Sequence, residues 1–113
     1  MKTELTQKRH EVIVHVADNP EDVARATGAA TAITQADRTL QVRIIVNGPA
    51  LGGLLDSAPA VEVTDGVTIE ACRVGLSRRG IDESQLQTPV SLVDSAAVAI
   101  VFAQRAGAAY VRL

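Results

Sequence analysis

The most reactive side chain in the sequence is that of Cys72, the only cysteine of the chain. A thiolate can act as a nucleophile or carry sulfur, and a nearby cation or helix start favours it. Val67–Ala71 alternates as a strand does, Arg73 follows Cys72 directly, and residues 78–80 carry the basic residues and glycine that end a helix. Cys72 is therefore predicted at a strand-to-helix junction, although a lone cysteine is more often a small buried apolar residue.

Polar residues follow two other apolar runs. Asp18 comes directly after the run at 11–17, and Asn47 and Gly48 come after the run at 40–46. Because parallel strands end at one edge of a sheet, we expect these residues beside the thiol, where open α/β sheets bind ligands. The predicted ligand-binding residues are Asp18, Asn47, Gly48 and Arg73.

Other kinds of site are not supported by the sequence. One cysteine with His10 and His15 does not provide a usual zinc ligand set, so no metal is expected. His15 lies between valines and is expected to be a hydrogen-bonded core residue. There is no dinucleotide or phosphate-loop fingerprint and no nucleophile elbow, so no cofactor is expected and no hydrolase or dehydrogenase motif is present. Whether the protein is an enzyme stays open at this point.

The elements that would position these residues alternate between strand and helix. Helices are predicted from about residue 20 to 36 and at 96–105, with shorter helical segments near 50–55, 73–79 and 81–86. This alternation is typical of a three-layer α/β fold, with a mostly parallel five-stranded sheet and helices on both faces. The strands are expected near residues 12–17, 40–46, 67–71, 90–93 and 109–112.

The last predicted helix is apolar almost all the way round, because Ala96 to Ala103 contains no polar side chain. A helix of this kind is usually covered on more than one side. One face of a sheet covers only one side of it, so we predict that the protein forms a homo-oligomer.

Length and charge narrow the class of protein. The chain has 113 residues, and we expect a flexible tail at 1–10 followed by a single domain at 11–113. A formal net charge of −2 predicts no general affinity for nucleic acid or anionic membranes. No apolar run resembles a signal peptide or spans a bilayer. A soluble cytoplasmic protein is expected, in a reducing compartment that suits a free thiol.

Three segments of the sequence resemble a known family. They are Cys-Arg-Val-Gly-Leu-Ser-Arg-Arg-Gly-Ile after the strand at 67–71, Val-His-Val-Ala-Asp in the first strand, and Ile-Val-Asn-Gly-Pro at the end of the second. From about Glu11 to Leu113 the chain resembles small members of the DsrE/DsrF-like sulfur-relay family, which has the YchN-like fold. The resemblance implies a compact parallel α/β fold, assembly into trimers or hexamers, and a persulfide carried on Cys72. Some members lack this cysteine.

Two functions therefore stay open. Cys72 could accept sulfane sulfur from a donor protein and pass it to an acceptor protein, since the chain has no second thiol. Alternatively, the protein could be a non-catalytic oligomeric module that binds a small ligand or a partner, with Cys72 in a structural role.

Overall fold

The computed structural model describes residues 10–113, which form one five-stranded sheet. The order across the sheet is β4-β3-β2-β1-β5, and every neighbouring pair is parallel. The strands are β1 (His10–Val16), β2 (Leu40–Val46), β3 (Val67–Cys72), β4 (Val90–Val93) and β5 (Ala109–Arg112).

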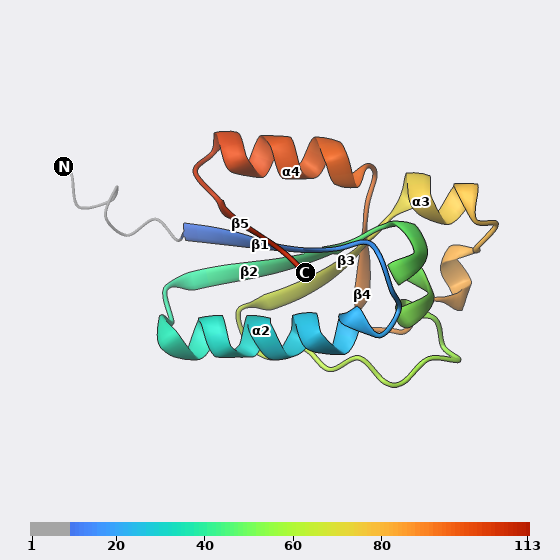
Figure 1. Ribbon diagram of the computed structural model, residues 1–113, viewed down its shortest axis with the longest axis horizontal. Helices are drawn as coiled ribbons and strands as arrows, with labels where there is room; N and C mark the ends of the chain where they lie inside the picture. The colour runs from blue at the N-terminus through green and yellow to red at the C-terminus, as the bar shows by residue number, and fades with distance from the viewer. Residues whose placement is uncertain (1–9) are drawn as a thin grey trace.

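Helices cover both faces of this sheet. In Figure 1, α2 (Asp22–Ala36) lies along one face and α4 (Ala96–Arg105) along the other. The short helix α3 (Arg73–Arg78) follows β3 directly at the end where the strands terminate. The three-layer parallel α/β fold predicted from the sequence is confirmed. Two further segments are 3-10 helices, η1 (Gly48–Leu54) and η2 (Glu83–Gln85), where ordinary helical turns were expected near 50–55 and 81–86.

The larger core lies between the sheet and α2. The central strands β1 and β2 pair along their full length, and their valines and isoleucines are buried on both faces, as the continuous apolar runs predicted. The small residues Ala26 and Ala30 of α2 are fully buried against this core, so the helix packs close to the sheet.

The core on the α4 side is smaller. It contains Ile13 and Ile45 from the central strands, Cys72, and Ala96 and Ala103 from α4. The opposite side of α4 stays exposed, and its large apolar residues form what we call the α4 patch. The members of the α4 patch are Val98, Val101 and Phe102, which are 52%, 53% and 61% exposed.

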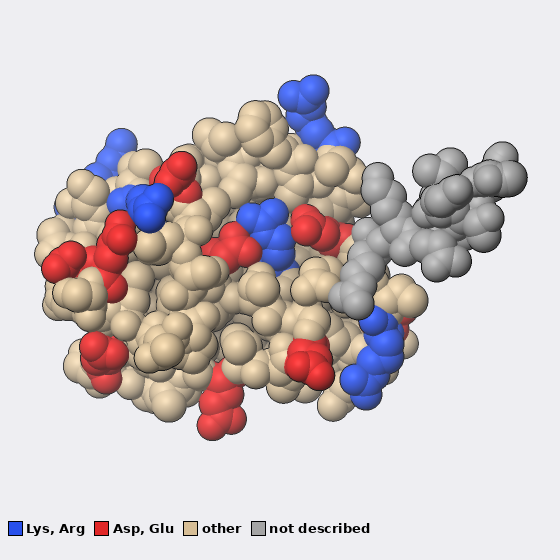
Figure 2. Space-filling model, turned by 180° about the vertical axis from the view of Figure 1, so that it is seen from behind, with Lys and Arg blue, Asp and Glu red and all other residues tan. Residues whose placement is uncertain are grey.

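A charged group also lies on the α4 side of the sheet. Arg43 of β2 donates to both carboxylate oxygens of Glu70 on β3, at 2.9 and 2.8 Å. Thr68 donates to Glu70 as well, and Glu11 approaches Arg43 at 3.6 Å. The hydrogen bonds and charge of Glu70 raise the pKa of Arg43. On the face seen in Figure 2, basic and acidic side chains are interspersed.

Two expectations from the sequence concern the tail at residues 1–10 and the absence of a segment that spans a bilayer. β1 begins at His10, which was expected in the tail, and the rest of the predicted tail lies outside the described residues. Within residues 10–113, no helix combines the length and the apolar character that crossing a membrane requires.

Candidate functional site

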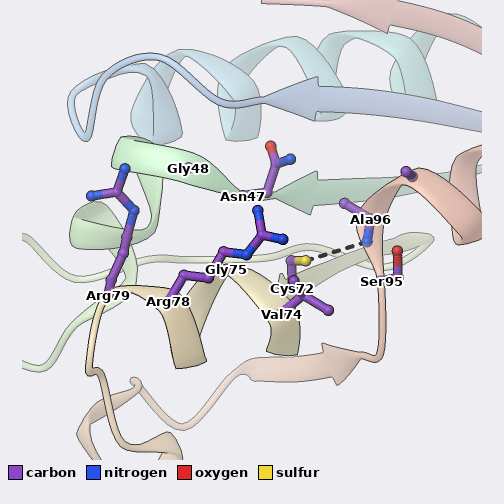
Figure 3. A pocket seen from close by; sticks show the side chains of 10 residues that line it. Asn47, Gly48, Cys72, Val74, Gly75, Arg78, Arg79, Ser95 and Ala96 are labelled. Carbon is purple, nitrogen blue, oxygen red and sulfur yellow. Dashed lines mark hydrogen bonds between the residues drawn. The ribbon is translucent and has the colours of Figure 1, made fainter.

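A pocket opens where the central strands end, and Cys72 lies in its wall. The ends of β2, β3 and β4 meet there with α3 and the start of α4, around a cavity of about 630 Å³. We call it the Cys72 pocket (Figure 3). Its lining residues are Asn47, Gly48, Cys72, Val74, Gly75, Arg78, Arg79, Ser95, Ala96 and Ala97.

The sulfur of Cys72 is held by the first amide of α4. The Ala96 N–H donates to Sγ at 3.3 Å, and Cys72 is 5% exposed. Ser95 caps the same helix by accepting from the Val98 amide at 3.3 Å. The Ala97 amide, at the second position of α4, has no acceptor within the helix. The positive end of a ten-residue helix therefore faces the part of the pocket wall that holds Cys72, and a helix start of this kind favours a bound anion.

Two arginines give the pocket a positive charge. Arg78 and Arg79 line the Cys72 pocket, and no carboxylate is among the lining residues. In Figure 3, Arg78 extends into the space between Asn47 and Cys72, and Arg79 extends along the Gly48 end of the pocket. Neither guanidinium pairs with a carboxylate of residues 10–113, unlike Arg43 and Arg73. Both arginines are therefore available to an anion.

The floor of the pocket requires glycine at two points. Gly48 has a φ of +58°, and a Cβ there would lie 2.9 Å from the carbonyl oxygen of Ala17. A Cβ at Gly75 would lie 2.8 Å from Cδ1 of Leu51. Side chains at these positions would strain the turn after β2 and push α3 away from η1. The two glycines thus keep the walls close together.

Asn47 is the predicted binding residue with the most defined contacts. Its Oδ1 lies 2.9 Å from Nε2 of His15, and Nδ1 of His15 lies 2.7 Å from the hydroxyl of Tyr110. His15 is buried and hydrogen-bonded, as expected. No hydrogen bond within residues 10–113 uses Nδ2 of Asn47.

The structure places the other two predicted binding residues elsewhere. Arg73 donates to Glu83 at 3.0 Å and to Asp94 at 2.7 Å, and these hydrogen bonds raise its pKa. Asp18 accepts from Arg112 at 2.9 Å, linking the end of β1 to the end of β5. Neither Arg73 nor Asp18 lines the Cys72 pocket, whereas Asn47, Gly48 and Cys72 do.

Sequence reasoning missed the contribution of α4. We expected the amides at the start of α3 to lie beside the Cys72 sulfur. Cys72 is the N-cap residue of α3, but its sulfur accepts no hydrogen bond from the amides of that helix. Ala96 of α4 supplies the donor instead. The signal was available, because a fourth parallel strand ending at Val93 had to bring Ser95 and Ala96 to the same edge. No group of three histidine, cysteine or carboxylate side chains within residues 10–113 could hold a metal ion.

Comparisons with known proteins agree with this fold. No protein family model matches the chain, and no curated protein matches it. Among solved structures, the chain resembles the protein of unknown function MTH1491 from Methanobacterium thermoautotrophicum, with 20% identity and a TM-score of 0.78, over 92% of this chain and 99% of that one. It also resembles the ychN protein from E. coli, with 16% identity and a TM-score of 0.67, over 94% and 100% of the two chains. At these identities the likeness establishes a shared YchN-like fold.

Proposed function

We propose that the protein is a sulfur carrier in which Cys72 holds sulfane sulfur as a persulfide. One observation carries the proposal: the Cys72 sulfur accepts a hydrogen bond from the first amide of α4 and lies in the wall of a pocket whose two arginines pair with no carboxylate of residues 10–113. A persulfide is an anion at neutral pH and needs donors or cations around its outer sulfur. The helix start and the arginines supply both.

The transfer is a thiol–disulfide type of exchange. The Cys72 thiolate attacks the outer sulfur of a donor persulfide, so that a new S–S bond forms on Cys72 while the donor's S–S bond breaks. The donor leaves as a thiolate, and no oxidant is consumed. An acceptor thiolate then attacks the outer sulfur, and Cys72 returns to its thiolate. Because Cys72 is the only cysteine, the acceptor is another molecule.

The low exposure of Cys72 is compatible with this role. An S–S bond is about 2.05 Å long, so the second sulfur extends from the wall toward the lumen of the pocket. The cavity of about 630 Å³ has room for it and for the attacking group of a partner. A partner that presents a persulfide on a narrow projecting segment fits an opening of this kind. Donor and acceptor are accordingly proteins of the cytoplasm, whose reducing conditions keep a lone thiol free.

Sulfur uptake tests the proposal directly. The native protein is incubated with inorganic polysulfide, the excess reagent is removed, and the mass of the protein is measured by native mass spectrometry. We expect a gain of one sulfur atom that a thiol reductant reverses, and no gain for Cys72→Ser. A wild-type protein that stays at its original mass, while an added low-molecular-weight thiol in the same tube is converted, would exclude the carrier function.

The alternative is a binding module that holds a small anion in the Cys72 pocket without covalent chemistry. It is favoured by the burial of Cys72, which is 5% exposed and bonded to Ala96. The rate of Cys72 alkylation against pH separates the two functions. A carrier reacts in the native state through its thiolate, whereas a packed thiol reacts only as fast as the protein unfolds.

The same proposal includes assembly into a homo-oligomer, a trimer or hexamer by the family resemblance. It is supported by the α4 patch, because Val98, Val101 and Phe102 are more than half exposed on a single helix. Contiguous apolar surface of this kind commonly marks a protein interface.

A further inference from the structure

The Asn47 carboxamide is fixed by a chain of two hydrogen bonds that runs back into the sheet. Nε2 of His15 lies 2.9 Å from Oδ1 of Asn47, and Nδ1 of the same ring lies 2.7 Å from the Tyr110 hydroxyl. His15 lies near the carboxyl end of β1 and is 9% exposed, while Tyr110 lies on the edge strand β5. The chain of hydrogen bonds thus runs from β5 through β1 to Asn47, the residue that directly follows β2.

The atoms in this chain determine where the protons lie. A carboxamide oxygen only accepts hydrogen bonds, so Nε2 of His15 must carry the proton that it shares with Asn47. In the neutral ring Nδ1 is then an acceptor, and the Tyr110 hydroxyl donates to it. If the ring is protonated, Nδ1 donates to Tyr110 and the bond to Asn47 is unchanged. In both states the oxygen of Asn47 is engaged, and its nitrogen has no hydrogen-bond partner among residues 10–113.

From this geometry we propose that Asn47 donates from Nδ2 to the anion held in the Cys72 pocket, and that His15 is the positioning residue that orients it. The inference rests on the proposed function, in which that anion is the outer sulfur of the Cys72 persulfide. Asn47 lines the pocket, and its Nδ2 has no hydrogen-bond partner within residues 10–113. An amide turned the other way would present its oxygen, which repels an anion.

The positioning role belongs to His15 because rotation of the carboxamide is otherwise unhindered by hydrogen bonds. Among residues 10–113, only the bond to His15 distinguishes the oxygen of Asn47 from its nitrogen. Tyr110 in turn fixes the ring, with the two ring centroids 5.8 Å apart and the planes tilted by 54°. The arginines attract any anion over several ångströms, whereas a fixed Nδ2 selects one location for it.

The proton arrangement can be read by NMR. In protein labelled with ¹⁵N at histidine, long-range ¹H–¹⁵N correlations identify the protonated nitrogen of His15 at a pH where the ring is neutral. We expect the proton on Nε2. A proton on Nδ1 would mean that Asn47 presents its oxygen to the pocket, and it would overturn the inference whatever Cys72 does.

The preference of the pocket for anions is tested with two alkylating reagents that are similar in size and differ in charge. Iodoacetate is anionic and iodoacetamide is neutral, and both react with the same thiolate, so the ratio of their rates at Cys72 cancels any change in its ionisation. For the near-isosteric Asn47→Asp we expect a ratio about tenfold below wild type, because a carboxylate replaces the donor. The control Gln35→Glu adds the same charge on α2, across the sheet, and should leave the ratio unchanged.

The role of His15 is tested by a matched pair. His15→Gln places an amide donor near the position of Nε2 and should keep the wild-type ratio, while His15→Leu should lower the ratio about threefold because Asn47 can then turn. Equal ratios in both variants, with both folded by circular dichroism, would overturn the positioning role. If wild type forms the persulfide and these ratios do not move, only this inference fails. If Cys72 reacts with neither reagent and takes up no sulfur, the carrier function fails with it.

Discussion

The sulfur of Cys72 and the backbone amide of Ala96 lie 24 positions apart in the sequence and 3.3 Å apart in the structure. The contact joins the end of β3 to the start of α4, across the gap between two neighbouring strands. It places the only thiol at the positive end of the longest helix on that face. The environment of Cys72 therefore depends on the strand beside it as much as on its own helix.

This contact predicts an order of stability for substitutions of Cys72. Serine keeps an acceptor for the Ala96 amide, whereas alanine leaves that buried amide without one at a cost of about 1 kcal/mol in the free energy of unfolding. We expect Cys72→Ser to be more stable than Cys72→Ala in urea unfolding. We also expect the Ala96 amide to exchange its hydrogen faster in the alanine variant than in the serine variant. An alanine variant at least as stable as serine would show that the bond contributes nothing.

Arg78 and Arg79 are predicted to attract anionic sulfur donors to the pocket. Replacing both with glutamine removes two positive charges, and we expect sulfur uptake from polysulfide to slow by about tenfold at low ionic strength. The difference should shrink as salt rises, because added ions screen charges beyond about 10 Å at 0.1 M.

The control for the arginine variant is Arg105→Gln at the far end of α4. Arg105 is exposed and does not line the Cys72 pocket, yet it belongs to the helix that contacts Cys72. Uptake that slows equally in both variants would indicate an effect of net charge rather than of the pocket.

Most of the fold could be predicted from the sequence because its signals are local. Residues 11–17 and 40–46 are nearly continuous apolar runs, which identify buried parallel strands, and Gly80 and Gly107 lie just beyond helices as expected. The formation of 3-10 helices at η1 and η2 was harder to predict. Gly52 and Gly53 in η1 disfavour an ordinary helix without specifying its replacement, whereas Pro49 in the first turn is compatible with either kind of helix.

The site was predicted less completely than the fold. Strand ends located Cys72, Asn47 and Gly48 correctly at one edge, because the direction of parallel strands follows from their connections. Where a long side chain points does not follow from this. Arg73 adjoins Cys72 in sequence, but its guanidinium is bound by Asp94 and Glu83 and does not line the pocket. The position of these two carboxylates depends on the fold of β4 and η2.

The ion pair between Arg43 and Glu70 is predicted to stabilise the sheet. In Glu70→Gln, the mostly buried guanidinium of Arg43 loses the carboxylate that accepts two of its hydrogen bonds and keeps only Glu11, at 3.6 Å, as a charged neighbour, so we expect unfolding to become easier by about 1–3 kcal/mol. The folded pKa of Arg43 is raised, so its contribution is present below its unfolded pKa and is lost only in strong alkali. The deficit should thus stay constant between pH 6 and 9 in urea unfolding. Glu62→Gln, at an exposed position, should cost little.

The α4 patch is predicted to hold the assembly together. Phe102 is the most exposed member of the patch, at 61%, and Phe102→Glu places a charge where an interface would have to bury it. By light scattering at micromolar concentration, we expect wild type at a multiple of the 11.8 kDa chain mass and Phe102→Glu near 11.8 kDa. Ala32→Glu puts the same charge on the exposed side of α2 and should leave the oligomer intact.

The monomeric variant also shows whether the Cys72 pocket is complete in one chain. Ala97 lines that pocket and also borders the α4 patch, so a neighbouring subunit on the patch would reach the mouth of the pocket. If Phe102→Glu is monomeric, folded and takes up sulfur at the wild-type rate, one chain supplies the whole site. A monomer with slow uptake would mean that the neighbouring subunit shapes the mouth. A wild-type protein that is already monomeric would refute the assembly, because the α4 patch would then be exposed in solution without a partner copy.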